Sequence, residues 1–136
     1  NPRDLDAVLK ELAKHRFHSF PAVNTLFNAL ANHPSFNTVN WKSLIMSVGG
    51  GMAVQSAVAK LWLEKTGCPI VEGYGLSETS PSATCNPVDS TAYSGNIGLP
   101  MPNTDLKLLD DDGNGLQPRQ SRRLCSALIV LRDLHR

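Results

Sequence analysis

The residues best suited to chemistry lie together in one stretch of the chain, Val71-Glu72-Gly73-Tyr74-Gly75-Leu76-Ser77-Glu78-Thr79. The glycines allow the backbone to approach a ligand closely, and Tyr74 offers a flat aromatic face on which a base can stack. Ser77 supplies a hydroxyl, and Glu78 is a hard oxygen ligand suited to Mg²⁺ on a nucleotide. The combination indicates a nucleotide-binding corner at the end of a strand. The alternative is a glycine-rich turn in which Ser77 and Glu78 only cap a helix.

The segments around this stretch alternate between helix and strand. Apolar residues at helical spacing predict helices over residues 4–15, 24–32 and 54–66, with Asp4 and Asn24 as N-caps and Gly67 as the stop of the third. Short apolar runs predict buried strands at 17–23, 44–48 and 68–71, and residues 35–40 form a polar connector. This order predicts an α/β fold, a parallel sheet covered by helices on its faces. Ligands of such sheets lie beyond the carboxyl ends of the strands, where both glycine turns, 49–51 and 73–75, are expected.

After Pro81 the pattern changes to short strands at 82–85 and 104–109, separated by turns rich in proline and glycine. This change predicts a smaller β region that starts at about residue 82. Three consecutive aspartates at 110–112 invite a calcium-loop interpretation, but the ninth and twelfth positions of such a loop are Pro118 and Ser121. We therefore predict a hairpin turn there.

Composition excludes several classes of function. The chain has 136 residues, is 41% hydrophobic and 18% charged, and carries a net charge of +1, which suits one globular domain and predicts no nucleic-acid partner. It contains no apolar run of membrane-spanning length and no signal peptide. Three scattered cysteines and four histidines without ligand spacing predict reduced thiols in a cytosolic protein rather than disulfides or a zinc site. Because the first residue is not methionine, we expect the chain to begin inside a longer protein.

Several motifs resemble those of one enzyme superfamily. Residues 74–78 resemble the Tyr-Gly-x-Thr/Ser-Glu motif of adenylate-forming enzymes, the superfamily of acyl-CoA synthetases and luciferases. Residues 48–52 resemble its glycine-rich turn, and residues 95–102 its Gly-x-x-Gly-x-Pro segment. With residues 23–30 added, the chain is most similar to the bacterial long-chain fatty acid–CoA ligases. The likeness runs from Asn1 to about Pro118.

The resemblance implies a fold, a reaction and a role for each site residue. Residues 1–81 would form an α/β portion, and 82–118 a β-rich portion, of the large N-terminal AMP-binding domain. The whole enzyme would activate a long-chain fatty acid with ATP and transfer the acyl group to coenzyme A, in the cytoplasm or peripherally at the inner membrane. Site roles would fall to seven residues: Glu78 on Mg²⁺, Ser77 on the α-phosphate, Tyr74 on adenine, Gly73 and Gly75 at a close backbone approach, and Gly50 and Gly51 along the adenine and acyl sides. Ser77 replaces the commoner threonine, and Ala53 stands where the family often has proline.

The chain departs from the family at its end. Residues 119–136 contain five arginines and one acid, where a Pro-x-Gly-x-x-Gly-Glu-Leu segment is expected. We favour a shifted reading frame as the cause, and the alternative is a real basic amphipathic helix with Leu124, Leu128 and Leu131 on one face. The phosphate loop, the ribose-binding aspartate and the C-terminal lysine of the family are missing. We therefore expect this chain by itself to be inactive, and its partners to include the missing parts of its own full-length protein.

Two other functions fit parts of the pattern. In an α/β-hydrolase, Gly75-Leu76-Ser77-Glu78-Thr79 would be the elbow that carries a nucleophilic Ser77, although Thr79 replaces the second glycine of that motif. The only histidine after Ser77 is His135. In the non-enzymatic alternative, the chain is a folding fragment or a binding module.

Overall fold

Helices and strands alternate from the N-terminus to β3, as the sequence predicts. The structure is a computed structural model, and it describes residues 1, 3–79, 81–109, 112–115 and 127–132. Its first half comprises α1 (Leu5–Leu12), β1 (Ser19–Ala22), α2 (Asn24–Ala31), η1 (Pro34–Thr38), η2 (Trp41–Ser43), β2 (Met46–Gly49) and α3 (Ser56–Thr66). Its second half comprises β3 (Ile70–Gly75), η3 (Ser77–Thr79), β4 (Ser82–Cys85), β5 (Leu99–Pro100), β6 (Thr104–Leu109) and β7 (Ala127–Arg132). Here α denotes an α-helix and η a short 3₁₀-helix.

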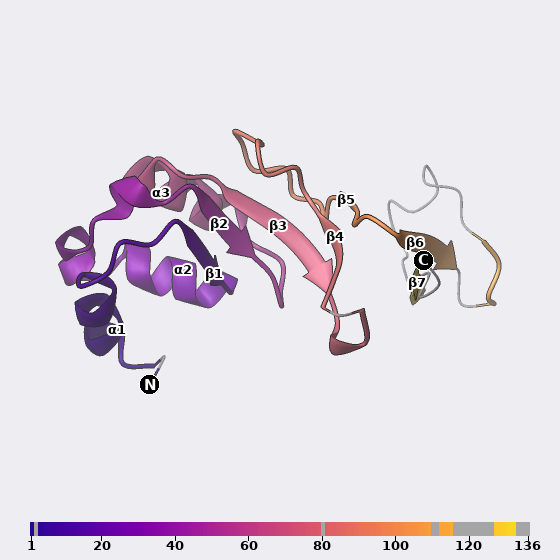
Figure 1. Ribbon diagram of the computed structural model, residues 1–136, viewed down its shortest axis with the longest axis horizontal. Coiled ribbons are helices and arrows are strands. Elements are labelled where there is room, and N and C mark those ends of the chain that lie inside the picture. The colour runs from indigo at the N-terminus through magenta and orange to yellow at the C-terminus, as the bar shows by residue number, and fades with distance from the viewer. Residues whose placement is uncertain (2, 80, 110–111, 116–126, 133–136) are drawn as a thin grey trace.

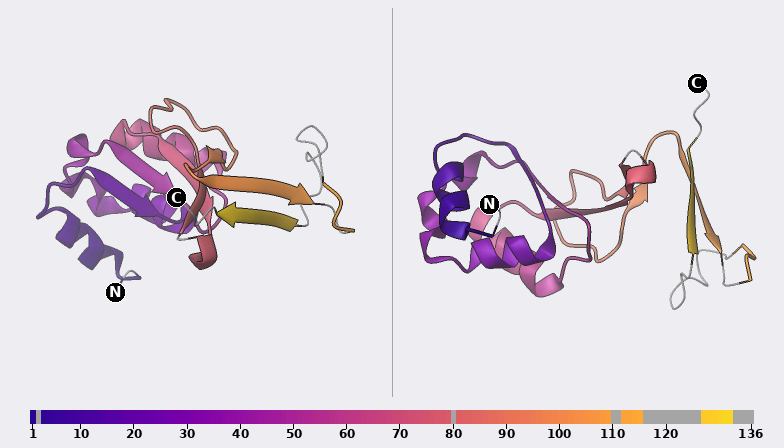
Figure 2. Two further views of the ribbon diagram at one scale, coloured as in Figure 1. Left: turned by 45° about the vertical axis from the view of Figure 1, so that its right-hand side comes forward. Right: turned by 90° about the horizontal axis from the view of Figure 1, so that it is seen from below.

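Five strands form the main sheet in the order β1-β2-β3-β4-β5. The first three are parallel, β4 is antiparallel to β3, and β5 is antiparallel to β4. The predicted parallel layer of helices and strands is confirmed, and so is the α/β fold class. Figure 1 shows α1, α2 and α3 grouped at the N-terminal end of the sheet, with the β6–β7 ribbon at the far end. The two further views in Figure 2 show the same separation.

The core lies between the three helices and one face of the parallel strands. Phe20, Ser47 and Ile70 stand in one row across β1, β2 and β3, and Trp62 of α3 packs over this row. The Trp62 ring stacks on Phe20 with centroids 5.8 Å apart, and its Nε1 donates to Ser47 Oγ at 2.9 Å. The Ser47 hydroxyl lies 3.4 Å from Cys68 Sγ. Because a buried indole N–H without a partner would be costly, Ser47 lets a tryptophan occupy the centre of the core.

The helix ends follow the sequence signals in two cases of three. Asp4 caps α1 by accepting from the Ala7 N–H at 3.0 Å, and Gly67 ends α3 in the left-handed conformation with φ +73°. The predicted Asn24 cap is wrong, because the N-cap of α2 is Val23. The Asn24 side chain instead accepts from the Gln55 N–H at 2.9 Å and holds the chain just before α3.

Two other predictions need correction. Residues 35–40 are not merely a polar connector: they overlap η1, and Phe36, 2% exposed, stacks on Trp41 at 4.8 Å between centroids. The strand predicted at 68–71 is β3, and it extends through Gly75 rather than ending before the glycines. Gly73 and Gly75 pair with Cys85 and Ser82 of β4. Both glycines therefore belong to the sheet.

The chain after β5 forms a separate two-stranded ribbon of β6 and β7. A bridge between Leu109 and Gly115 agrees with a hairpin turn at 110–115, although Asp110 and Asp111 lie outside the described residues. Leu128 and Leu131 lie in β7, so the amphipathic helix that was the alternative for the tail does not form at these residues, and Leu124 lies outside the described part. Among the described residues no helix is both long and apolar enough to cross a bilayer.

Candidate functional site

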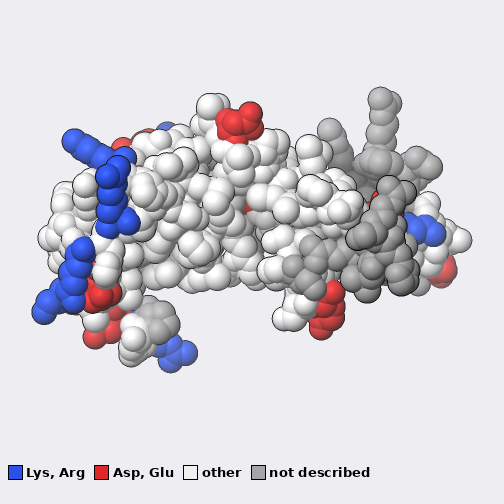
Figure 3. All heavy atoms as spheres, viewed as in Figure 1, with Lys and Arg blue, Asp and Glu red and all other residues white. Residues whose placement is uncertain are grey.

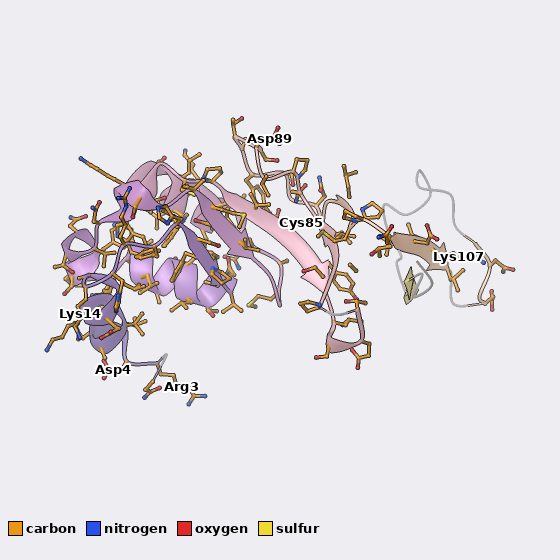
Figure 4. All side chains as sticks on the ribbon, in the orientation of Figure 1. Arg3, Asp4, Lys14, Cys85, Asp89 and Lys107 are labelled. Carbon is orange, nitrogen blue, oxygen red and sulfur yellow. The ribbon has the colours of Figure 1, made fainter. Side chains whose placement is uncertain are left out.

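Strand β3 ends between two cavities that share a wall. Cavity A, about 410 Å³, lies on the side of Glu72, Tyr93 and Ile97. Cavity B, about 320 Å³, lies on the side of Ser77, Pro81 and Cys85, and Figure 4 shows the Cys85 side chain on β4 next to β3. The wall between them consists of residues that line both: Gly49, Gly51, Gly73, Tyr74, Gly75 and Leu76. Both volumes fall in or near the range of small-molecule sites.

The structure brings most of the predicted site residues to this wall. Tyr74 and the glycines Gly51, Gly73 and Gly75 line both cavities, while Gly50 and Ser77 line cavity B only. Glu78 lines neither cavity and lies exposed on η3, next to Ser77. The β2–α3 glycine turn and the end of β3 therefore meet, as expected for the carboxyl ends of adjacent parallel strands.

Thr79 fixes the turn that carries Ser77 and Glu78. Its hydroxyl accepts from the Leu76 N–H at 2.9 Å and lies 2.9 Å from the Leu76 carbonyl and 2.6 Å from the Pro81 carbonyl. Thr79 is 6% exposed, whereas Ser77 and Glu78 are exposed. Ser77 and Glu78 lie on η3, a helix of only three residues. Thr79 thus turns both functional groups outward.

Two glycines of the wall have different reasons to be glycine. At Gly75 a Cβ would lie 1.9 Å from the Pro81 carbonyl oxygen, so the approach of the protein's own backbone excludes a side chain. At Gly51 the φ of +76° lies in the left-handed region that favours glycine. Gly75 is therefore required by the turn into β4, independently of any ligand.

Glu72 is the one charged residue that lines cavity A. It is 8% exposed, and burial raises the pKa of its carboxyl despite backbone N–H groups of Gly95 and Val54 that lower it. The Gly95 N–H donates to Oε2 at 3.1 Å. Burial also raises the pKa of the Tyr93 hydroxyl, with a smaller contribution from the Glu72 charge. A negatively charged cavity of this kind favours an uncharged or donor-bearing group over a phosphate.

The loop between β4 and β5 closes cavity A from the other side. Asn86, 7% exposed, donates from Nδ2 to the Asn96 carbonyl at 2.7 Å and to the Glu72 carbonyl at 3.3 Å. Thr84 donates from Oγ1 to the Ile97 carbonyl at 2.5 Å. At Gly98, φ is +87° and a Cβ would lie 2.1 Å from the Cys85 carbonyl carbon. This close approach explains why the resembling segment at 95–102 carries a glycine there.

Sequence reasoning missed Glu72, Thr79 and Tyr93. Glu72 did give a signal, because a carboxylate directly after the apolar run Pro69-Ile70-Val71 is unusual in a buried strand. Tyr93 gave none, because the carbonyl that it binds belongs to Val54, which lies 39 residues away.

The surroundings of Glu78 suit a metal ion that is shared with a ligand. Among the described residues, no group of three or more His, Cys, Asp or Glu side chains is close enough to hold a metal alone. Glu78 makes no hydrogen bond or ion pair with other described residues. Mg²⁺ at nucleotide sites commonly takes one or two carboxylates, with phosphates and water supplying the rest. One exposed, unpaired carboxylate fits that arrangement.

The hydrolase alternative lacks its base in the described part of the chain. The histidines described there are His15, His18 and His33, all before β2. His15 contacts Glu11 at 3.0 Å and His33 lies 3.6 Å from Asp6. Both belong to the helical end, and His135 lies outside the described residues.

The positively charged side chains are also distributed unevenly between the site and the helical end. In Figure 3 most of the blue lysine and arginine atoms lie at the helical end and some lie at the opposite end, while the middle is mostly white with red acidic groups at its edges. Neither lysine nor arginine lines cavity A or cavity B. The site therefore offers an aromatic face, hydroxyls and carboxylates to a ligand. Among the described residues, no cationic side chain lines either cavity.

Comparisons with known proteins agree with the motifs. The chain matches the AMP-binding enzyme family over residues 1–126, past the point near Pro118 where we expected the likeness to end. It is 51% identical over 114 residues to the long-chain-fatty-acid–CoA ligase of Haemophilus influenzae, and the aligned region covers 84% of this chain and 20% of that protein. It is 50% identical over 125 residues to the ligase of the same name from Escherichia coli O157:H7, covering 92% of this chain and 22% of that protein.

A solved structure supports the fold. The crystal structure of the anthranilate CoA ligase AuaEII in complex with anthranoyl-AMP matches with a TM-score of 0.77 and 25% identity, over 86% of this chain and 22% of that one. The chain thus spans about a fifth of the length of the curated relatives that it matches. These matches leave the hydrolase alternative without support.

Proposed function

This chain belongs to the AMP-binding enzyme family, and from that membership we propose that the full-length protein which carries it is a long-chain fatty acid–CoA ligase. The enzyme would use ATP to convert a fatty acid to an acyl-adenylate and would then transfer the acyl group to coenzyme A. The identity of about half to ligases of that name supports the substrate class. The observation that carries the proposal is the shared wall of cavities A and B, which contains Tyr74 and three of the four predicted glycines, Gly51, Gly73 and Gly75.

The two cavities suit the two substrates of the first step. In cavity A the ring of Tyr74 offers a stacking face, and Glu72 supplies the only formal charge, so an uncharged base fits better than a phosphate. In cavity B the lining includes Val48, Leu76 and Pro81 together with the Ser77 hydroxyl. We assign adenine to cavity A and the carboxyl end of the acyl chain to cavity B. The α-phosphate would then lie at the shared wall, near Ser77.

The first step joins two anions. A carboxylate oxygen of the fatty acid attacks the α-phosphorus, the bond to the bridging oxygen breaks, and pyrophosphate leaves with the electron pair. In the second step the thiolate of coenzyme A attacks the acyl carbon, and AMP leaves. Positioned donors stabilise the charge that builds up at the α-phosphate. Ser77 is the donor that this chain provides, and the backbone at Gly73 and Gly75 keeps the wall thin enough for both substrates to approach.

Glu78 would hold Mg²⁺ at the phosphates. When bound, the ion neutralises phosphate charge as the pyrophosphate leaves. The chain's own contribution is to present this carboxylate unpaired, on a turn that the Thr79 hydroxyl holds in place. Cytoplasmic location, where ATP and coenzyme A are available, and contact with the inner membrane as the source of the fatty acid complete the proposal.

The test replaces Glu78 by Gln in the full-length protein. The change is nearly isosteric but removes the charge, so ATP–pyrophosphate exchange should fall by about two orders of magnitude or more, while the melting temperature stays within a few degrees because the side chain is exposed. Glu64→Gln is the matched control, since Glu64 is also exposed and, among the described residues, forms an ion pair only with Lys60, at 4.0 Å. Exchange near the wild-type rate in Glu78→Gln would remove Glu78 from the metal site.

A further inference from the structure

The side chain of Tyr93 lies between cavity A and a smaller cavity beside α3. This smaller space, cavity C, has a volume of about 160 Å³. Among the described residues, Tyr93 is the one that lines both cavities. Most of the remaining lining of cavity C comes from α3 and from the start of β3: Ser56, Ala59, Lys60, Leu63, Pro69 and Ile70. Four of these six side chains are apolar, so cavity C suits an apolar group.

The Tyr93 hydroxyl fixes the ring at this boundary. It donates to the Val54 carbonyl at 2.7 Å. Val54 precedes α3, whose own hydrogen bonds begin with the Gln55 carbonyl, so Tyr93 satisfies a carbonyl that the helix does not use. A Cβ added at Gly95 would lie 3.4 Å from Cε1 of the ring and 3.5 Å from its hydroxyl oxygen, so the ring also packs on the Gly95 backbone. A ring that is bonded at its tip and packed on one side keeps one position.

The loop between β4 and β5, which carries Tyr93, is also held by bonds of other residues. The Gly95 N–H donates to Glu72 Oε2 at 3.1 Å, and Asn86 Nδ2 donates to the Asn96 carbonyl at 2.7 Å. Neither bond involves the Tyr93 side chain. Removal of the ring should therefore open cavity A into cavity C while the loop stays in place.

The one carboxylate in the lining of cavity A lies close to this boundary. Glu72 accepts from the Gly95 N–H, and Gly95 packs against the Tyr93 ring. Under the proposed function the occupant of cavity A is adenine, whose exocyclic amine is a hydrogen-bond donor. A donor is placed best when it faces an ionised acceptor, and the Glu72 side of the cavity is also the Tyr93 side. The amine of the base would then point toward the ring.

We propose that Tyr93 is a specificity-determining residue that closes cavity A toward α3 and so excludes bases with a bulky group on the exocyclic amine. The identity of the base rests on the proposed function, whereas the separation of the two cavities does not. Without the ring, cavity C would add about 160 Å³ of mostly apolar space to cavity A. A bulky apolar group on the amine would gain from being buried there.

The test measures the nucleotide selectivity of the full-length protein by fatty-acid-dependent pyrophosphate release. Selectivity is the ratio of kcat/KM for N6-benzyl-ATP to kcat/KM for ATP, and it should rise roughly 10- to 100-fold in Tyr93→Ala. Both nucleotides are measured on one preparation, so a smaller folded fraction cancels in the ratio. Tyr93→Phe keeps the ring without its hydroxyl and should leave the ratio within about threefold of the wild-type value. An unchanged ratio in Tyr93→Ala, or an equal rise in Tyr93→Phe, would overturn the proposal.

A second substitution tests whether the benzyl group enters cavity C. Ser56 lines cavity C from an exposed position at the start of α3, so Ser56→Leu should fill part of that space. Added to Tyr93→Ala, it should reverse most of the gain in selectivity, and a gain that persisted would also overturn the proposal. If the wild-type protein does not use ATP at all, the proposed function fails. A crystal structure of Tyr93→Ala still decides the role of the ring, because cavities that remain separate there would show that Tyr93 does not divide them.

Discussion

Gly75 and Gly50, which both line cavity B, should respond very differently to the same added methyl group. A Cβ on Gly75 would lie 1.9 Å from the Pro81 oxygen, 2.8 Å from the Pro81 carbonyl carbon and 2.9 Å from the Ser82 Cα. All three atoms are backbone, so relief requires the β3–β4 turn to move. A Cβ added at Gly50 would have the Gly73 oxygen as its nearest atom, at 3.8 Å, which is an ordinary contact. The φ of Gly50 is not positive.

The expected energies follow from these distances. Overpacking against rigid neighbours costs about 1–3 kcal/mol and sometimes more, and since the obstacle is backbone we expect about 3 kcal/mol for Gly75→Ala. Gly50→Ala should change the free energy of unfolding by less than about 1 kcal/mol, because a compatible Gly→Ala change mainly restricts the unfolded chain. The predicted gap is therefore about 2–3 kcal/mol between two identical chemical changes.

Urea unfolding of this chain followed by tryptophan fluorescence measures the gap, because Trp41 and Trp62 are both buried in the core. The two variants should have the wild-type m-value and differ in midpoint. In the full-length protein Gly50→Ala, which adds a methyl group to the lining of cavity B, should reduce activity without loss of fold. Equal midpoints for both variants would refute the reasoning, since the steric difference would then have no energetic consequence.

Three further predictions concern the turn, the buried acid and catalysis. Thr79→Val should lower the free energy of unfolding by about 1–3 kcal/mol, because the Leu76 N–H loses its acceptor. Urea midpoints measure this loss, and Thr79→Ser, which keeps the hydroxyl, should retain most of the wild-type stability. Glu72 has a raised pKa, so its contribution to stability is full below the ordinary value of 4.5 and is lost as pH rises through the raised value. The melting temperature of wild type minus that of Glu72→Gln should therefore be larger at about pH 4 than at about pH 7, and a constant difference would contradict this. This chain with fatty acid, Mg-ATP and coenzyme A should release no AMP, because neither cavity wall carries a lysine or arginine to meet the phosphates; AMP release abolished by Glu78→Ala would show otherwise.

The sequence predicted the parts of the fold that depend on local patterns. The stripe of Leu5, Val8, Leu9 and Leu12 forms a helix whose residues join the core, and Gly67 ends α3 as its position suggests. The parallel layer follows from the alternation of helical and strand periodicity in the apolar residues. The two glycine turns meet because adjacent parallel strands end at the same edge. Motif spacing then gave the family.

The errors arise where a distant partner decides the outcome. Asn24 looks like a cap within its own helix, yet it bonds to the Gln55 N–H, 31 residues away. The extent of β3 could not be read from its glycines, because β4 pairs with them across a turn that requires Gly75 to lack a side chain. Tyr93 donates to the Val54 carbonyl and Glu72 accepts from the Gly95 N–H, and no short-range pattern encodes either contact. Site roles depend on such contacts more than helices do.

The site residues fall into two groups according to the contacts that hold them in place. The wall of Gly73, Tyr74 and Gly75 is part of a sheet strand, paired on one side with β4 and continuous on the other with the parallel layer. Cavity A is closed by bonds among described residues, from Glu72, Tyr93 and Asn86. Ser77 and Glu78, in contrast, project from a three-residue helix into solvent, and only their backbone is fixed, through Thr79. The shape of cavity A is therefore built into this chain, whereas the groups proposed to act on the phosphates need a ligand, a metal and further protein to give them a fixed geometry. In the proposed ligase, binding and chemistry are therefore expected to separate between Tyr74 and Ser77.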